Sequence, residues 1–232
     1  GDHVVFKNAS LTIERGDKVA FVGKNGEGKS TLVKCIMNEI DHDGTLTLGH
    51  NVQIGYFAQN QASLLDENLT VFQTIDDVAK GDIRNKIRDL LGAFMFGSPE
   101  ASMKKVKVLS GGERTRLAMI KLLLEPVNLL ILDEPGTGLD ALARERLLVT
   151  IERLAKDTDI TIIFVTHYPE EILPSFDNCL LLRNSAIYKV GKTREIFTSE
   201  TISDFFNHPV TVEWKNEKYD FAIPADALKS FA

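Results

Sequence analysis

The sequence has few cysteines, no long apolar run and no excess of positive charge. Its 232 residues include two cysteines, Cys35 and Cys179, which lack the CxxC or histidine spacing of a metal site. We expect both to be buried, reduced thiols. The longest apolar runs, at residues 129–132 and 160–165, are far shorter than the roughly 18 residues of a membrane-spanning helix. The chain is therefore not expected to insert into a membrane.

Charge and composition are those of an ordinary globular protein. The formal net charge is −6 and the pI is near 5.4, which gives no indication of a nucleic-acid-binding surface. Hydrophobic residues make up 44% of the chain, enough for a large core, and the length is compatible with one domain or with two closely packed lobes. The first residues lack the basic and apolar regions of a secretion signal, so the sequence predicts a cytoplasmic protein.

Apolar residues recur with the periods of alternating strands and helices. Predicted strands lie at residues 4–6, 11–13, 18–22, 44–48, 52–57, 128–132 and 160–165, with 44–48 and 52–57 as a pair. Predicted helices lie at 29–38, 112–124 and 141–155, with a helical insert at 70–92. Apolar strands that alternate with helices indicate an α/β fold with a mainly parallel sheet. Residues 210–214 and 218–223 predict a β-hairpin appended to that fold.

A glycine-rich segment at residues 23–30 matches the phosphate-loop pattern G-x-x-x-x-G-K-[ST] and lies between a predicted strand and helix. Its backbone N–H groups and the dipole of the following helix suit phosphate oxygens. We expect Lys29 to add an exposed charge and Ser30 to ligate Mg²⁺. A nucleoside triphosphate is the expected ligand, with a chance glycine turn as the alternative. The expected binding residues are Gly23, Asn25, Gly26, Gly28, Lys29, Ser30 and Thr31.

The apolar run at residues 129–132 ends in two carboxylates, Asp133 and Glu134, followed by Pro135. This order places both acids at the carboxyl edge of the sheet. Asp133 is suited to hold hydrated Mg²⁺, and Glu134 is suited to polarise a water molecule in line with the γ-phosphate. A solvated turn is the alternative interpretation of such a strand end.

The sequence Leu109-Ser110-Gly111-Gly112-Glu113 precedes a predicted helix and offers a hydroxyl and backbone N–H groups to a phosphate. By itself it is typical of a helix cap. Together with the phosphate loop and the acidic strand, in this order, it resembles the signature LSGGQ or LSGGE of the ATP-binding cassette (ABC) ATPases. The resemblance covers essentially the whole chain.

The resemblance implies roles for three further residues. Gln59 matches the Q-loop glutamine expected to contact Mg²⁺ and the attacking water, and Asp140 in Gly138-Leu139-Asp140 matches the D-loop. His167 matches the switch histidine that contacts the γ-phosphate. The implied catalytic residues are Glu134, His167 and Gln59, and the implied metal ligands are Ser30, Gln59 and Asp133.

The resemblance also implies a composite site that needs a second cassette. Ser110, Gly111 and Gly112 are expected to contact ATP held by Lys29 and Ser30 of a head-to-tail partner, either an identical chain or a different cassette. It further implies a P-loop fold with an antiparallel β subdomain in one domain, residues 1–232. Within it, residues 1–69 and 126–200 form the ATP-binding core, 70–125 the helical subdomain with the signature, and 201–232 the appendage.

Two styles of cassette motif occur in the chain. Up to about Leu132 the motifs resemble the ABC-F subfamily, whose members act on ribosomes. The segments at residues 134–140 and 166–171 look more like a stand-alone cassette or a transporter-type cassette, and the partners of the latter are membrane subunits. We therefore hypothesise a chimera joined near residues 129–135, with a divergent natural cassette as the alternative.

Recognition of the base and the extent of turnover are left open. The family's adenine-stacking aromatic residue typically lies just before Gly1, and His3 or Phe6 is a candidate substitute, although Phe6 fits a core position. An ATPase is the leading hypothesis, and an ATP-binding module with little turnover is the alternative. A GTPase is disfavoured because the sequence Asn85-Lys86-Ile87-Arg88 lacks the aspartate of the NKxD motif.

Overall fold

The computed structural model describes residues 9–58, 61–79 and 87–224. The chain folds into two units. Unit 1 comprises Gly1–Gly49 and Thr161–Ala232, and unit 2 comprises His50–Ile160. The predicted strand at residues 4–6 lies outside the described residues. The predicted division into an ATP-binding core, a helical subdomain and an appendage draws other boundaries and stays a prediction.

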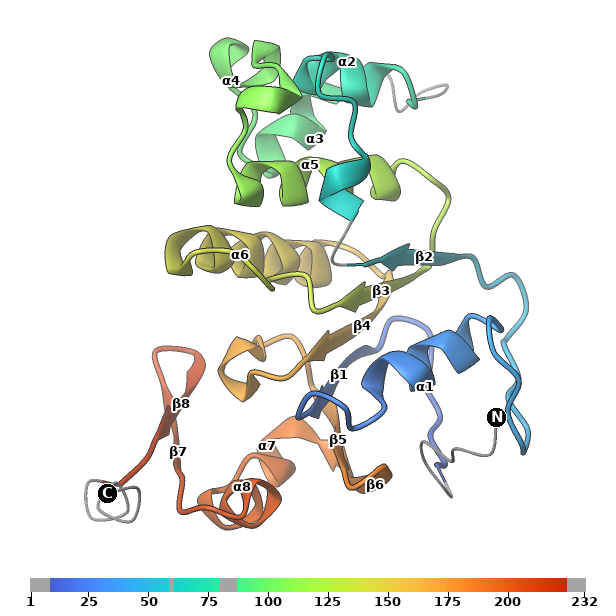
Figure 1. Cartoon of the computed structure of the whole chain (residues 1–232), viewed down its shortest axis with the longest axis vertical. Coiled ribbons are helices and arrows are strands. Elements are labelled where there is room, and N and C mark those ends of the chain that lie inside the picture. The colour runs from blue at the N-terminus through green and yellow to red at the C-terminus, as the bar shows by residue number, and fades with distance from the viewer. Residues whose placement is uncertain (1–8, 59–60, 80–86, 225–232) are drawn as a thin grey trace. The chain divides into compact units, whose positions relative to one another are not determined.

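In unit 1 the strands β4, β1, β5 and β6 lie side by side in this order (Figure 1). β1 (Lys18–Gly23) pairs in parallel with β4 (Thr161–Thr166) on one side and with β5 (Asn178–Arg183) on the other. β6 (Ala186–Lys192) runs antiparallel to β5. All six residues of β4 and five of the six in β1 are buried, which explains why these strands are almost continuously apolar.

Short helices and a hairpin complete unit 1. α1 (Lys29–Ile36) follows β1, η4 (Pro169–Glu171) follows β4, and α7 (Thr193–Ile196) and α8 (Ser199–Phe206) follow β6. The predicted hairpin is confirmed as β7 (Thr211–Lys215) and β8 (Lys218–Ala222), joined by Asn216 and Glu217, both at positive φ. Tyr219 anchors the hairpin, because it is buried and its ring lies edge-on to Phe197 with centroids 4.9 Å apart.

Unit 2 combines a strand pair with a group of helices. β2 (Ile54–Phe57) pairs in parallel with β3 (Leu129–Asp133). The helices are η1 (Gln61–Leu64), α2 (Val71–Asp76), α3 (Ile87–Ala93), α4 (Pro99–Met103), η3 (Val106–Val108), α5 (Gly111–Leu123) and α6 (Ala141–Asp157). Helices α2 to α5 form one group (Figure 1). α5 packs closely on α6, since a Cβ built on Gly112 lies 2.7 Å from the Ala143 Cβ.

Two predicted strands are wrong. Residues 11–13 and 44–48 form no strand, and β2 pairs with β3 instead of with 44–48. The alternation of threonine and leucine at 44–48 predicts one apolar face, but Leu46 and Leu48 are 36% and 43% exposed, so this face buries little apolar surface. Within the described part of the chain, antiparallel pairing of strands occurs at β5–β6 and β7–β8, so the predicted antiparallel β subdomain is not formed there.

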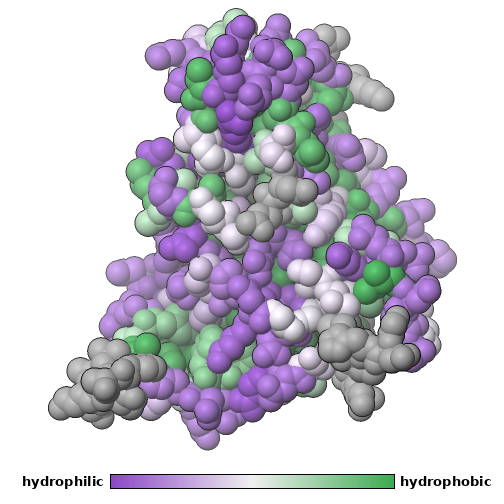
Figure 2. All heavy atoms as spheres, viewed as in Figure 1, coloured by the Kyte–Doolittle hydropathy of each residue, from purple (hydrophilic) through white to green (hydrophobic). Residues whose placement is uncertain are grey.

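The helical insert predicted at residues 70–92 contains the separate helices α2 and α3, and residues 80–86 of it lie outside the described part of the chain. The other predicted elements match the structure within a few residues, and both cysteines are buried and free, as expected. The strands β5 and β6 and the helices α4, α7 and α8 were not predicted. None of the helices among the described residues is long and apolar enough to span a membrane. On the face drawn in Figure 2, polar residues cover most of the surface and apolar residues form small separate patches.

Candidate nucleotide-binding site

The phosphate loop depends on glycine at three positions. A Cβ on Gly23, the last residue of β1, lies 2.8 Å from the backbone oxygen of Leu182, so the neighbouring strand leaves no room for a side chain. Gly26 and Gly28 have φ values of 87° and 90°, which glycine adopts without strain. The loop is therefore closely packed on one side and sharply turned at two points. This conformation is the one that directs successive backbone N–H groups to one side.

Lys29 is buried, contrary to the expectation of an exposed loop charge. The residue is 4% exposed, and its Nζ donates to the backbone oxygens of Gly23 at 2.8 Å and Lys24 at 3.1 Å. The Lys29 side chain thus links the end of the loop to its first two residues. Because these bonds hold the loop in shape, Lys29 contributes to folding as well as to the charge of the site.

The N-terminus of α1 is suited to an anion. Its N-cap, Gly28, offers no side-chain hydrogen bond, and the first turn of the helix contains no acidic residue. The first N–H groups of the helix and its positive dipole end are therefore not neutralised by the helix itself. Ser30 is exposed beside this end. The carboxylate of Glu27 points elsewhere, since its Oε2 accepts the Ser185 N–H at 3.1 Å.

The strand register of unit 1 brings His167 to the same sheet edge as the phosphate loop. Val22 of β1 is paired with Thr166 of β4, so Gly23 and His167 leave adjacent parallel strands at the same end. The His167 ring lies against the Tyr168 ring, with centroids 3.8 Å apart. The structure therefore brings together these two predicted parts of the site, although they are more than 130 residues apart in sequence.

Asp133 is held at the end of β3 by Tyr56. The Tyr56 hydroxyl donates to Asp133 Oδ2 at 2.9 Å, and Asp133 is 8% exposed. Its second oxygen, Oδ1, is buried and has no hydrogen-bond partner among the residues that the structure describes. A buried carboxylate oxygen without a partner is unfavourable unless a cation or a donor occupies the position beside it. Asp133 therefore fits the metal ligand that the sequence predicts.

Glu134 and Asp140 belong to the turn between β3 and α6. Glu134 has a φ of 49°, a conformation that costs free energy for a residue with a side chain. Its backbone oxygen accepts the Thr137 N–H at 3.1 Å, which closes the turn. Asp140 is the N-cap of α6, and its Oδ1 accepts the Ala143 N–H at 2.8 Å. Asp140 thus has a capping role in addition to its predicted role at the nucleotide.

The predicted signature forms the N-terminus of α5. Ser110 is the N-cap, its hydroxyl accepts the Glu113 N–H at 3.3 Å, and the Glu113 carboxylate accepts the Ser110 N–H at 2.8 Å. This capping box fixes the exposed Ser110 and Gly111 at the end of the helix.

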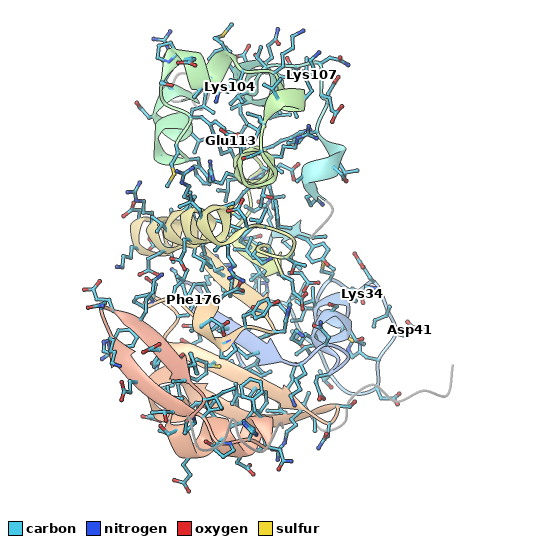
Figure 3. The ribbon with its side chains drawn as sticks, turned by 60° about the vertical axis from the view of Figure 1, so that its left-hand side comes forward. Lys34, Asp41, Lys104, Lys107, Glu113 and Phe176 are labelled. Atoms are coloured by element: carbon cyan, nitrogen blue, oxygen red, sulfur yellow. The ribbon has the colours of Figure 1, made fainter. Side chains whose placement is uncertain are left out.

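Residues around the signature lower the pKa of Glu113. Burial by itself raises the pKa of Glu113, but the bonds from Ser110 and the charges of Lys104 and Arg116 outweigh it and hold the pKa below its usual value. Figure 3 shows Lys104 beside the end of α5, where its Nζ lies 3.8 Å from Glu113 Oε1. The carboxylate is therefore charged at neutral pH, and it strengthens the cap.

The predicted site residues fall into two groups. Unit 1 holds the phosphate loop, Thr31 and His167, and unit 2 holds Asp133, Glu134, Asp140 and the signature. Gln59, His3 and Phe6 lie outside the described residues. Their roles, like the functional roles of the other site residues, stay predictions.

Comparison with known proteins identifies the family. The model of the family described as ABC transporter matches residues 6–137. The chain belongs to the ABC transporter family. This cassette is 44% identical to ABC transporter F family member 5 of Arabidopsis thaliana over 168 residues, 72% of this chain and 24% of the relative. It is 30% identical to the uncharacterized ABC transporter ATP-binding protein YlmA of Bacillus subtilis over 238 residues, 92% of this chain and 89% of the relative.

Solved structures have the same fold. cbiO1 from Clostridium perfringens, part of the ABC transporter complex cbiONQ, superposes with a TM-score of 0.70 at 24% identity, covering 88% of each chain. A dimeric post-hydrolysis state of the ATP-binding cassette MJ0796 with ADP and Pi superposes with a TM-score of 0.61 at 22% identity, covering 81% of this chain and 90% of that chain. The cassette is thus an α/β P-loop ATPase domain of the ABC family. It spans about a quarter of the length of the Arabidopsis relative.

Two residues that support the candidate site are not among the predicted site residues. Tyr56 lies in the predicted strand 52–57, and Glu171 lies in the segment at residues 166–171. Tyr56 is a half-buried residue of β2, where half-buried and buried positions alternate, so the sequence pattern alone does not separate it from a core residue. The signal that reveals it is the parallel register of β2 and β3, which only the folded chain provides.

Proposed function

We propose that this cassette binds MgATP in its phosphate loop and hydrolyses it to ADP and phosphate in a head-to-tail dimer. The observation that carries the proposal is the N-terminus of α1, which follows two left-handed glycines and has neither a side-chain cap nor an acidic first turn. This arrangement favours an anion with several oxygens. Lys29 adds positive charge at the same loop.

In the proposed reaction, water attacks the γ-phosphorus of ATP. A new oxygen–phosphorus bond forms, the bond to the β,γ-bridging oxygen breaks, and ADP leaves with that oxygen. Glu134 takes the proton of the attacking water as general base, and His167 contacts the γ-phosphate from the edge that it shares with the phosphate loop. The Gln59 side chain orients the water.

The residues proposed to hold Mg²⁺ are Ser30, Gln59 and Asp133. The buried Oδ1 of Asp133 supports this assignment, because it has no hydrogen-bond partner in the described part of the chain. A bound Mg²⁺ ion supplies positive charge against the negative charge that develops on the phosphate oxygens. The hydroxyl of Ser30 and the carboxylate of Asp133 are oxygen ligands, the type that Mg²⁺ prefers.

The signature is proposed to complete the site of the partner cassette. Ser110 and Gly111 are exposed at the N-terminus of α5, whose dipole also favours an anion. In the dimer, ATP bound to one phosphate loop contacts Ser110, Gly111 and Gly112 of the other chain. The dimeric MJ0796 cassette with ADP and Pi supports this arrangement as an analogy of fold.

The test is a titration of the full chain with MgATP at several protein concentrations. We expect dimers by analytical ultracentrifugation and phosphate release that rises faster than linearly with protein concentration while dimers are scarce. Binding without release indicates the alternative, an ATP-binding module with little turnover. Competition between ATP and GTP for binding tests which base the site selects. Asn85 and Lys86, in the segment that resembles an incomplete NKxD motif, lie outside the described residues.

ATP hydrolysis by a cassette is coupled to a process that the rest of the parent protein defines. We propose that the parent protein is either a ribosome-acting ABC-F protein, by analogy with the Arabidopsis F family relative, or a cassette that docks on membrane subunits, by analogy with cbiO1. A cytoplasmic location is part of both alternatives.

The join of two cassettes near residues 129–135 stays a prediction. The two motif styles support it, whereas the match to YlmA extends over 92% of the chain and supports the alternative of one natural protein. A join predicts loose packing between α5 and α6, but Gly112 and Ala143 are in close contact there. Hydrogen exchange tests it: slow, uniform exchange of α5 and α6 contradicts a join, and selectively fast exchange of their interface supports it.

A further inference from the structure

A buried polar pair flanks His167. Thr166, the last residue of β4, and Glu171, the last residue of η4, are 1% and 4% exposed. The Thr166 hydroxyl donates to Glu171 Oε2 at 2.5 Å and accepts the Tyr168 N–H at 3.0 Å. The residue before His167 is thus bonded to the residue after it and to the end of the same turn. These two bonds close a loop of six residues around the histidine.

The backbone of the same loop is fixed at its far end. The Glu171 N–H donates to the Tyr168 oxygen at 3.0 Å, and the Ile172 N–H donates to the Pro169 oxygen at 3.2 Å. Strand β8 of the C-terminal hairpin contacts η4. The loop therefore has little freedom to move as long as the Thr166–Glu171 bond is intact.

The pair lies in apolar surroundings, which makes its presence informative. Ile172, Leu173 and Phe176 follow Glu171 and are each less than 5% exposed, and Figure 3 shows Phe176 inside unit 1. An apolar pair of similar shape is often as stable as a buried polar pair in such surroundings. Apolar contacts are not directional, whereas hydrogen bonds are. A hydroxyl that donates to one group and accepts from another therefore fixes the conformation of the turn, which an apolar pair does not.

We infer that Thr166 and Glu171 are positioning residues that hold the His167 side chain at the edge shared with the phosphate loop. The inference rests on the proposed function, in which His167 contacts the γ-phosphate. The pair does not touch ATP. It acts through His167, so its loss is expected to slow hydrolysis while leaving the affinity for ATP nearly unchanged, because a displaced catalytic group loses much of its effect.

The first experiment compares steady-state ATP hydrolysis by variants of the full chain. We expect Thr166→Val to lower kcat about tenfold or more, with KM for ATP within about threefold of the parent. Thr166→Ser keeps the hydroxyl, and Glu171→Gln keeps an acceptor oxygen. Both variants should therefore keep most of the kcat of the parent. Thr193→Val is the matched control, because Thr193 is 2% exposed and its hydroxyl donates to the Phe176 oxygen at 2.5 Å, outside the loop of residues 166–171. It should lower the melting temperature without lowering kcat.

A double-mutant cycle separates positioning from general damage. In the His167→Ala background, Thr166→Val should lower kcat no further, because the group that it positions is already missing. An equal loss of kcat in both backgrounds overturns the inference, as does a parallel loss in Thr193→Val. If His167→Ala itself hydrolyses ATP normally, the proposed role of His167 fails, and the second experiment then decides the positioning.

The second experiment does not depend on hydrolysis. The imidazole resonances of the five histidines are recorded by NMR, and the His167 signal is assigned by its loss in His167→Ala. We expect Thr166→Val to shift or broaden that signal and Thr193→Val to leave it in place. A His167 signal that is unchanged in folded Thr166→Val, judged by circular dichroism, overturns the inference independently of any result with ATP.

Discussion

The Tyr56 hydroxyl donates to Asp133 Oδ2 at 2.9 Å, which joins the side chains of two paired strands at the carboxyl end of β2 and β3. The bond leaves Oδ1 as the Asp133 oxygen that has no hydrogen-bond partner among the described residues. We expect Tyr56 to hold the carboxylate in this orientation, which a phenylalanine cannot do because it lacks the hydroxyl.

Tyr56→Phe tests this relationship. We expect a loss of stability of about 1–2 kcal/mol, because the carboxylate of the buried Asp133 loses a hydrogen-bond donor. We also expect a higher Mg²⁺ concentration for half-maximal ATP hydrolysis, measured by titrating Mg²⁺ at fixed ATP. An unchanged Mg²⁺ requirement in a variant with the expected loss of stability contradicts the positioning role of Tyr56.

Lys29→Ala should weaken MgATP binding and also destabilise the cassette. Since the buried ammonium donates to the oxygens of Gly23 and Lys24, we expect a loss of about 1–2 kcal/mol in urea unfolding without nucleotide. Binding is measured by calorimetry at a temperature where the variant is folded. Lys24→Ala removes an exposed charge of the same loop and serves as the control. Equal affinity of Lys29→Ala and the parent for MgATP contradicts the phosphate-loop assignment.

Glu134→Gln should bind ATP normally and hydrolyse it at least about 10²-fold more slowly, the usual contribution of a positioned general base. Phosphate release in a single turnover measures the chemical step. Glu125→Gln changes an exposed glutamate before β3 and should behave like the parent. Near-normal hydrolysis by Glu134→Gln means that another group activates the water.

Ser110→Arg should bind ATP nearly as well as the parent but neither dimerise nor hydrolyse it, because the bulky charge enters the shared interface. Loss of the N-cap costs about 1 kcal/mol, and Ser110→Ala, which loses the same cap, controls for that loss. Mixing Ser110→Arg with Lys29→Ala chains should restore hydrolysis, since each heterodimer regains one working composite site. Activity of Ser110→Arg alone, in a sample shown to be monomeric, contradicts a signature that acts in trans.

Glu113→Gln should make stability less dependent on pH. The folded-state pKa of Glu113 lies below its usual value, so its charge stabilises the fold above the unfolded-state pKa of about 4.3 and loses this effect as the pH falls through the folded-state pKa. Glutamine keeps the capping oxygen but not the charge. We expect the parent to be more stable by about 0.5 kcal/mol at pH 7, with the difference vanishing once the pH lies below the folded-state pKa. A difference that is constant with pH in urea unfolding contradicts this account.

The amino-acid sequence alone was sufficient to recognise the family and the parallel core, and it predicted the segments of the candidate site. Residues 19–22, 129–132 and 162–165 are continuously apolar because both faces of these strands are covered, and such runs are visible without a structure. The phosphate loop and the signature are equally local. Glycines at 26 and 28 and the Ser110–Glu113 capping box depend on residues a few positions apart, so their conformations follow from short patterns.

Features that depend on contacts between distant segments of the chain became visible in the folded structure. Residues 44–48 alternate like a strand, but a strand forms only where another strand pairs with it, and β2 pairs with β3 instead. Lys29 looks like an exposed charge in the sequence and is buried because the loop turns back over its ammonium group. The pairs Tyr56–Asp133 and Thr166–Glu171 depend on strand register and on a turn after a strand, and neither has a sequence pattern of its own.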